Sequence, residues 1–506
     1  MTEFDYLVVG GGTAGCIVAA RLAEDPAVSV GLIEWGPSDE HEPRARSIRR
    51  WAEMLEGEYD LDYRSVPQER GNSAIRQARL RILGGCSTAN TMIAWRPRVA
   101  DLQEWADLGA RGWDAATVHP YYDRLQAPVT PVPPQDQNPF VAGVVSAAHS
   151  ALNLPLRSTW NDEDVIEGTG FFEIGYRPET NTRSSSSICY LHPAQRTRRN
   201  LQVLLRTRAL RLLLDGGNRV TGVLVRAAGG AVTEVTARRE VVVCAGAIDS
   251  PRLLQLSGIG PSAVLAGAGV DVRADLPGVG ENLMDHAEGI VVWEVAEPPS
   301  PVCATGWDAG ALLRLTPGAA RPDITMHFPV EAWVDHVVAH GTEMPPHYVA
   351  IAPNVSKPRS RGRVWITSAD PDDRPAVDYR YFTNADGADE AVLVAAVRAA
   401  RRIGESEPMA SRLRREVFPG PRATSDTDIS ALARATHQTV YHVSGTCRMG
   451  AADDPLAVLD PELKVRGVTG LRVADASVFP TIPSVNPVIT VMLVAERAAD
   501  LIRQDR

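Results

Sequence analysis

Residues 6–15 read Tyr-Leu-Val-Val-Gly-Gly-Gly-Thr-Ala-Gly, and this stretch decides the fold of the first part of the chain. An apolar segment typical of a strand precedes the glycines, and small and apolar residues at 16–23 follow them as in a buried helix. Strand, tight glycine turn and helix form the first half of a dinucleotide-binding unit. We expect Gly10 to permit the turn, Gly12 to let the backbone approach a pyrophosphate, and Gly15 to let helix and strand pack closely.

A second strand, predicted at residues 28–33, supports this interpretation. It ends at Glu34, about 20 residues beyond the glycines, where a carboxylate is expected to bind a ribose hydroxyl. The phosphates would lie at the N-terminus of the helix that begins near Thr13 and Ala14, because free N–H groups and the helix dipole favour negative charge there. The first strand, the helix, the second strand and the acid follow one another at the expected spacing. This order favours a nucleotide site over a plain glycine-rich turn.

Composition narrows the class of protein. The chain has 506 residues, enough for two or more domains, and its 44% hydrophobic and 23% charged residues are typical of a soluble globular protein. The net charge of -10, with no basic run, argues against a nucleic-acid binder. Six scattered cysteines without a Cys-x-x-Cys pair fit a reducing cytosol and indicate neither a disulfide framework nor a metal site.

The N-terminus does not read as a secretory signal. Glu3 and Asp5 stand where such a signal is basic, and three glycines interrupt the apolar run. No stretch of the sequence is long and apolar enough to span a bilayer. We therefore predict a cytoplasmic protein without membrane contact.

The middle of the chain alternates irregular and strand-like segments. Residues 39–79 read as loops and short helices, 81–92 as a buried glycine turn that passes close to a flat ligand, and the proline-rich 127–138 as a linker or lid. Strands are predicted at 203–205, 220–225 and 240–244. A short helix is predicted after them, with Ser250 as N-cap, Pro251 as its first residue and Gly258 as its stop.

From about residue 288 to 439 the pattern changes to that of a second domain. Alternating segments such as 323–328 and 363–366 predict an antiparallel sheet, and 390–403 predicts an amphipathic helix. A buried strand that ends in Asp475 follows, at 471–476.

Three blocks resemble the glucose–methanol–choline (GMC) flavoenzymes: the N-terminal glycine motif, residues 246–260 and residues 436–490. Residues 246–260 match the second signature of that family at every constrained position. Almost the whole chain is similar to the choline-oxidising branch of the family.

The resemblance implies an α/β fold with a discontinuous Rossmann-like FAD-binding domain and an α+β substrate domain that carries an antiparallel sheet. We place the FAD-binding domain at 1–135, 181–287 and 440–506, and the substrate domain at 136–180 and 288–439. The resemblance also implies bound FAD and oxidation of a small alcohol by hydride transfer to the flavin N5 atom. The residues that it places against the cofactor are Gly10, Gly12, Thr13, Ala14, Gly15, Glu34, Trp35, Gly84, Gly85, Ser87, Asn90, Thr91, Ala209, Gly246, Asp475, Ala476, Asn486 and Pro487.

The resemblance assigns catalysis to His442 and Asn486. A neutral imidazole can take the hydroxyl proton so that the carbinol carbon releases hydride. Asn486 can also cap a helix whose first residue is Pro487, and that helix would aim its positive end at the flavin.

The resemblance implies that a carboxylate surrounded by aromatic rings binds the cationic head group of the substrate. Charge attraction and cation–π contacts are the physical reason. The matching residues are Glu288, Trp51, Trp307 and Tyr441, with His327, Trp333, Val440 and Thr91 also in the pocket. A plainer alternative is that Glu288 pairs with an arginine and that the tryptophans belong to the core.

Three departures from the family pattern have consequences. Ala89 occupies the position of the flavin-linking histidine, so we expect non-covalent FAD, with a lower flavin potential. Thr91 and Trp333 are larger than their counterparts, which alters the shape of the pocket. The 127–138 stretch is shorter than the family's, so substrate access is expected to differ. Val440, which faces the flavin where oxygen reacts in the relatives, is retained and favours an oxidase over a dehydrogenase.

The leading hypothesis is oxidation of choline or a related cationic amino alcohol to the aldehyde, or further to the acid, with oxygen or another acceptor and with a homodimer as the expected assembly. An uncharged primary alcohol is the first alternative. A hydroxynitrile-lyase-type reaction, in which FAD is structural, is the second, because fold alone does not define the reaction. A non-catalytic FAD-binding protein fits poorly with His442 and Asn486 both present.

Overall fold

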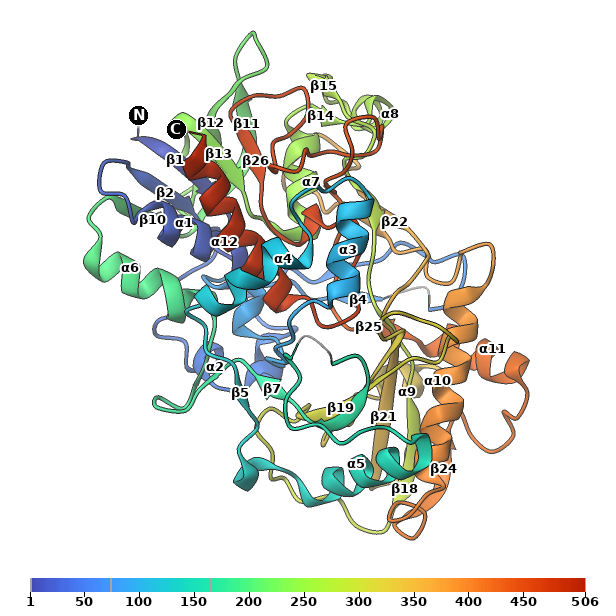
Figure 1. Cartoon of the computed structure of the whole chain (residues 1–506). Helices are drawn as coiled ribbons and strands as arrows, with labels where there is room; N and C mark the ends of the chain where they lie inside the picture. Colours follow the sequence, from blue (N-terminus) through green and yellow to red (C-terminus); the bar gives the residue numbers. More distant parts are fainter. Residues whose placement is uncertain (1, 73–74, 163–164, 506) are drawn as a thin grey trace.

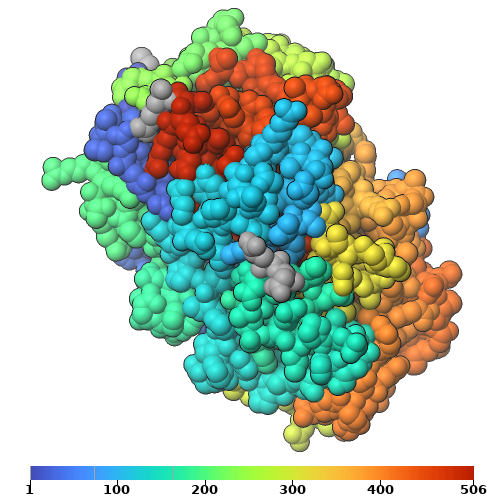
Figure 2. Space-filling model, in the orientation of Figure 1, coloured from blue at the N-terminus to red at the C-terminus, as the bar shows by residue number. Residues whose placement is uncertain are grey.

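Two large sheets dominate the computed structural model, which describes residues 2–72, 75–162 and 165–505. One sheet lies at the end of the molecule that holds both chain termini, and the other lies at the opposite end (Figure 1). In the space-filling view the blue N-terminal and red C-terminal segments share one end of the surface, while teal and orange residues form the other (Figure 2). The expected α/β fold with a separate antiparallel sheet is confirmed.

The first sheet gathers seven strands from three distant parts of the chain. Its strands are, in spatial order, β10 (Leu201–Leu204), β2 (Val30–Ile33), β1 (Thr2–Val9), β13 (Val232–Val243), β12 (Val220–Ala227) and β11 (Thr207–Leu214), with β26 (Leu471–Val473) paired to β13. β10, β2, β1, β13 and β26 run parallel, and β12 and β11 continue antiparallel.

The register of the parallel strands aligns their carboxyl ends. Val9 pairs with Ile33 and with Val243, and Val243 pairs with Val473. The segments that follow these four strands therefore leave the sheet at one edge. In open parallel sheets this edge is where ligands bind.

The second sheet is antiparallel and has eight strands. They are β24 (Leu413–Phe418), β18 (Val291–Val295), β21 (Tyr348–Val355), β20 (Ile324–His327), β19 (Ala309–Leu313) and β6 (Gly168–Phe171), with β17 (Ala287–Glu288) paired to β21 and to β25 (Gln438–Thr439). A third sheet joins β16 (Glu281–Leu283), β22 (Gly362–Trp365) and β23 (Ala376–Asp378). Short pairs complete the strands: β3 (Tyr63–Arg64) with β4 (Arg76–Gln77), β5 (Thr130–Pro131) with β7 (Glu173–Ile174), β8 (Tyr176–Arg177) with β9 (Thr182–Arg183), and β14 (Ile259–Gly260) with β15 (Ala274–Asp275).

Helices cover both sheets. α1 (Thr13–Leu22) and α12 (Val488–Gln504) share a hydrophobic core with the first sheet, and α5 (Pro139–Leu152) and α10 (Ala388–Gly404) share one with the second. The other α-helices are α2 (Pro43–Arg46), α3 (Val99–Asp107), α4 (Ala115–Val118), α6 (His192–Thr197), α7 (Gly246–Leu256), α8 (Ser262–Gly267), α9 (Asp335–Ala339) and α11 (Asp426–Thr436). None of the helices in the described residues is long and apolar enough to cross a membrane.

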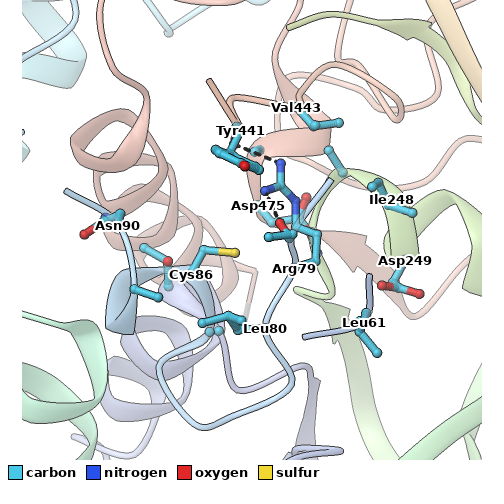
Figure 3. Close-up of a pocket in the computed structure, with 18 of the residues that line it drawn as sticks. Leu61, Arg79, Leu80, Cys86, Asn90, Ile248, Asp249, Tyr441, Val443 and Asp475 are labelled. Atoms are coloured by element: carbon cyan, nitrogen blue, oxygen red, sulfur yellow. Dashed lines mark hydrogen bonds between the residues drawn. The ribbon is translucent and has the colours of Figure 1, made fainter. Parts of the chain in front are cut away.

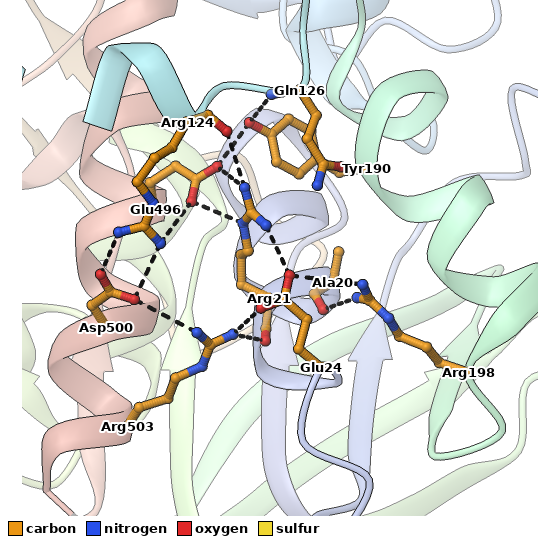
Figure 4. A network of polar contacts seen from close by, with 10 residues as sticks. All are labelled: Ala20, Arg21, Glu24, Arg124, Gln126, Tyr190, Arg198, Glu496, Asp500 and Arg503. Atoms are coloured by element: carbon orange, nitrogen blue, oxygen red, sulfur yellow. Dashed lines mark hydrogen bonds and ion pairs between the residues drawn. The ribbon is translucent and has the colours of Figure 1, made fainter. Parts of the chain in front are cut away.

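A buried ion pair joins α1 to α12. Arg21 donates from Nε and Nη2 to the two carboxylate oxygens of Glu496, at 2.9 and 2.8 Å, and Tyr190 donates to the same carboxylate at 2.8 Å (Figure 4). Glu496 is fully buried. Both helices begin at the ligand-binding edge of the first sheet, so this pair fixes the relative position of two helix N-termini.

The start of α7 differs from the sequence prediction. The helix begins at Gly246, and Pro251 lies inside it. A proline there leaves the carbonyl of Ala247 without its helical donor, and the Thr446 hydroxyl replaces that donor at 2.6 Å. Ser250 does not cap the helix; its hydroxyl donates to Asp475 at 2.5 Å. The predicted stop is confirmed, because Gly258 follows the C-cap with φ +81°.

Two further boundaries are corrected. α12 begins at Val488 with Pro487 at the N-cap position, so Asn486 lies one residue before the cap and its side chain makes no capping hydrogen bond. β2 begins at Val30 rather than at residue 28.

The strands of the first sheet all fall within the three segments predicted for the FAD-binding domain. The third sheet pairs residues 281–283 with 362–365, across the predicted boundary. The division into two domains stays a proposal.

Candidate active site

A cavity of about 360 Å³ lies at the carboxyl edge of the first sheet and extends to the second sheet. The N-termini of α1 and α12, the 84–92 turn and the 438–443 segment line it. Figure 3 shows part of its wall, where Arg79 donates to the carbonyl of Tyr441 at 2.9 Å and Cys86 lies near Asn90.

Most residues predicted to touch the cofactor line this cavity. They are Gly10, Gly12, Thr13, Ala14, Glu34, Trp35, Gly85, Asn90, Thr91, Ala209, Gly246, Asp475, Ala476, Asn486 and Pro487. Three predicted residues do not line it. A Cβ on Gly15 would lie 1.8 Å from the Gly10 carbonyl oxygen, Gly84 has φ +88°, and the Ser87 hydroxyl donates to the Gly84 carbonyl at 2.6 Å. These three residues shape the wall from behind.

The cavity wall fits a flavin dinucleotide. Gly12 and Gly85 form a floor without side chains, where a Cβ on Gly85 would lie 2.8 Å from Gly12 Cα. The first turn of α1 carries no acidic residue, so its N–H groups are suited to a pyrophosphate. The Glu34 carboxylate accepts hydrogen bonds from the backbone of Gly11 at 2.8 Å and Gly36 at 2.6 Å, and each oxygen retains a lone pair for a ribose hydroxyl.

The catalytic end of the cavity centres on His442. Its backbone N–H donates to Asp285 at 2.8 Å, and Asp285 also accepts from Tyr381 at 2.5 Å and from the Thr439 hydroxyl. Burial lowers the pKa of His442 well below its usual value. A neutral imidazole at the cavity wall can accept a proton from a bound hydroxyl group. Asn486, also at the wall, offers an amide to the same region.

Glu288 and His327 form a buried pair at the other side of this end. Glu288 comes from β17 and His327 from β20, each is 2% exposed, and His327 Nδ1 donates to Glu288 at 3.2 Å. Burial raises the pKa of Glu288. Among the described residues no arginine lies in ion-pair range of Glu288, so the plainer alternative of a Glu–Arg pair is not supported.

Four aromatic side chains enclose this pair. Ring centroids lie 5.2 Å apart for Trp51 and Trp333, 6.0 Å for Trp307 and Trp333, and 6.3 Å for Trp333 and Tyr441. Trp307 also packs edge-on against His327 at 5.6 Å. Val440 and Thr91 line the cavity with them. A carboxylate among aromatic rings is an arrangement suited to a small organic cation.

Sequence reasoning missed several residues at this site. His286 lies 2.8 Å from His442, Nδ1 to Nδ1, Asp285 and Arg79 face the same histidine, and Gln438 forms a hydrogen bond with Glu288. Residues 285 and 442 are far apart in the chain, so no local pattern indicates the contact. The Asp-His sequence after a glycine loop was the available signal.

Known proteins resemble this chain along its whole length. Two family models, both described as GMC oxidoreductase, match residues 4–288 and 358–495. Choline oxidase of Arthrobacter globiformis is 46% identical over 524 residues, covering 100% of this chain and 95% of the relative. The oxygen-dependent choline dehydrogenase of Photobacterium profundum is 34% identical, covering 99% and 93%. Among solved structures, pyridoxine 4-oxidase from Mesorbium loti superposes with a TM-score of 0.91 at 30% identity and covers 98% of both chains.

Proposed function

Because the chain belongs to the GMC oxidoreductase family and is an FAD-dependent alcohol oxidoreductase, we propose that its substrate is choline or a related small cationic alcohol, oxidised to the aldehyde. The name of the 46% identical relative supports this substrate class. The observation that carries the proposal is Glu288, a carboxylate that is 2% exposed and pairs with a histidine inside an aromatic enclosure. A buried carboxylate is costly without a counter-charge, which a cationic substrate supplies.

The roles of the side chains follow from their positions. Glu288 and the aromatic rings hold the cationic head, which leaves the hydroxyl group at the His442 end of the cavity. His442 takes the hydroxyl proton, and the Asn486 amide orients the oxygen. FAD, when bound, supplies the hydride acceptor.

We also propose that the FAD is held without a covalent bond, because the methyl group of Ala89 offers no nucleophile. Oxygen is the proposed electron acceptor, and the exposure of Val440 to the cavity supports it. The homodimer and the cytoplasmic location stay predictions from the sequence.

An uncharged primary alcohol is the second candidate substrate. One observation favours it: Glu288 already has a buried polar partner in His327 at 3.2 Å, so its carboxyl group has a hydrogen-bond partner without a cationic substrate.

Anaerobic visible spectra of the purified holoenzyme test the proposal. Choline is expected to bleach the flavin bands, and admitting oxygen is expected to restore them quickly. Bleaching by 3,3-dimethylbutan-1-ol, the neutral analogue of equal shape, but not by choline would support the second candidate and refute the first.

A further inference from the structure

His286 contacts His442 through a nitrogen–nitrogen hydrogen bond. The two Nδ1 atoms lie 2.8 Å apart, and the rings meet edge to face with centroids 5.0 Å apart and planes at 88°. The Nε2 atom of His286 lies 3.2 Å from the carbonyl oxygen of Pro483. His286 is 1% exposed, and besides these two partners the backbone of Ser356 also forms a hydrogen bond with its ring.

The partners of His286 determine where its proton lies. A carbonyl oxygen only accepts, so the Nε2 of His286 must carry a proton. Burial, reinforced by the charge of Lys357, lowers the pKa of His286 to about 3, so the ring stays neutral and holds no second proton. Its Nδ1 therefore presents a lone pair to His442.

From this geometry we propose that His286 is a positioning residue that holds His442 in the tautomer protonated at Nδ1. The Nδ1–H of His442 is the donor that the His286 lone pair requires. The Nε2 of His442 is then unprotonated, and His442 lines the cavity. This inference deepens the proposed function, because it names the atom of His442 that receives the substrate proton.

The opposite arrangement is unfavourable on two counts. If His286 carried its proton on Nδ1, its Nε2 lone pair would face the Pro483 carbonyl in a buried site, and each unpaired polar group there costs about 1–3 kcal/mol. His442 would then hold its proton on Nε2, and its one lone pair, at Nδ1, would accept the hydrogen bond from His286 and would not be free for a substrate hydroxyl group. Among the groups that face the pair, Arg79 disfavours protonation of His442, Lys357 disfavours protonation of His286, and His327 disfavours both.

Nitrogen-15 NMR of the FAD-loaded protein with labelled histidine tests the tautomer directly and needs no substrate. His442→Gln assigns the resonances of His442 by their loss. For His442 we expect the nitrogen-15 chemical shift of a protonated (pyrrole-type) nitrogen at Nδ1 and that of an unprotonated (pyridine-type) nitrogen at Nε2. A pyrrole-type Nε2 would overturn the proposal, whether or not the enzyme oxidises choline.

Two substitutions at His286 test its consequence. His286→Leu removes the acceptor, so we expect flavin reduction to slow by about a hundredfold, the lower end of the range for proton transfer by a positioned side chain. The dissociation constant of the unreactive ion tetramethylammonium should not change. His286→Asn keeps an oxygen near the Nδ1 position and should recover most of the rate. Two results would contradict the positioning role. One is an equal rate of flavin reduction in the wild type and both variants. The other is an equal loss of that rate in His286→Leu and His286→Asn when both variants bind tetramethylammonium normally.

Discussion

Glu288 is the residue on which discrimination between charged and neutral alcohols depends. In Glu288→Gln the charge is lost while the shape is kept, and the coupling between close charges of opposite sign is about 1.5 kcal/mol or more. We therefore expect KM for choline to rise about 10- to 100-fold. The neutral analogue 3,3-dimethylbutan-1-ol serves as the internal control, and steady-state kinetics measure both. An equal rise for the two alcohols would contradict the cation-holding role.

The raised pKa of Glu288 also predicts a pH dependence of cation binding. A carboxyl group with a raised pKa protonates at higher pH than usual, so the affinity for tetramethylammonium should fall on acidification, and the fall should begin at a higher pH than for an ordinary glutamate. Flavin absorbance titrations at several pH values measure the affinity. In Glu288→Gln the same titrations should give a weak affinity that does not change with pH.

Gly15 is a position where a single methyl group should disrupt the cofactor site. A Cβ there would lie 1.8 Å from the Gly10 carbonyl oxygen, which belongs to the turn itself. We expect Gly15→Ala to lose stability by about 1–3 kcal/mol or more, as other overpacked sites do, and to bind FAD poorly. Gly216→Ala is the matched control, because a Cβ at Gly216 meets no atom within 4 Å. Denaturant unfolding and FAD fluorescence compare the two variants.

The site residues that could be predicted from the sequence belong to patterns of neighbouring residues, and those that could not be predicted depend on contacts between distant parts of the chain. Gly10, Gly12 and Glu34 follow strands whose pattern is visible in the first few dozen residues, so their place at the cavity was predictable. The His286–His442 contact joins residues 156 apart in the chain, and only the folded sheets bring them together. Small residues such as Gly84 and Ser87 predict a close approach to a ligand, which stays a prediction; a Cβ on Gly84 would also lie 2.5 Å from the Ser187 hydroxyl, so protein packing requires the glycine as well.

At the scale of helices, the ion pair between α1 and α12 determines how two N-termini face the cavity. Glu496→Gln removes the buried carboxylate partner of Arg21 and leaves it the more exposed carboxylate of Glu24. Breaking a buried pair costs about 3–5 kcal/mol, and the remaining contact with Glu24 should place the loss at the lower end of that range. We expect a lower free energy of unfolding and weaker FAD binding. The exposed pair of Lys464 and Glu462 provides the control, since Glu462→Gln should cost less than about 1 kcal/mol. Similar losses in both variants, measured by urea unfolding of the holoenzymes, would contradict this account.

Helix boundaries show where local rules failed. Ser250 and Pro251 form a good cap and first turn by sequence, yet α7 begins at Gly246 because Thr446 supplies the donor that Pro251 lacks. Asn486 has the side chain of a good cap for α12, but it lies one residue too early. In the first case a partner far away in the chain decides the local conformation. Long periodic elements such as α10 were predicted almost to the residue.

For the whole molecule, the proposed non-covalent binding of FAD can be tested by whether the flavin stays with the denatured protein. Acid precipitation should release yellow flavin into the supernatant, and flavin that stays with the pellet would refute the proposal. Ligand binding to the folded state adds about 2.7 kcal/mol at 100 times Kd. Apoprotein prepared under milder conditions should therefore unfold at a lower temperature than the holoenzyme, and added FAD should restore the difference, as measured by calorimetry.

The same cavity has a consequence for biosynthesis. Its wall includes residues from Val9 to Val491, and β1 pairs with β13, which follows it in the chain only after the β2, β10, β11 and β12 strands. A ribosome has thus made the chain as far as Val491 before the whole nucleotide site can form. Until β13 is made, the apolar β1 strand lacks one of its two neighbours in the sheet, and incompletely paired strands of nascent chains aggregate or recruit chaperones. Riboflavin supply should therefore affect the yield of active protein at the stage after the chain leaves the ribosome, and not while the chain is being elongated.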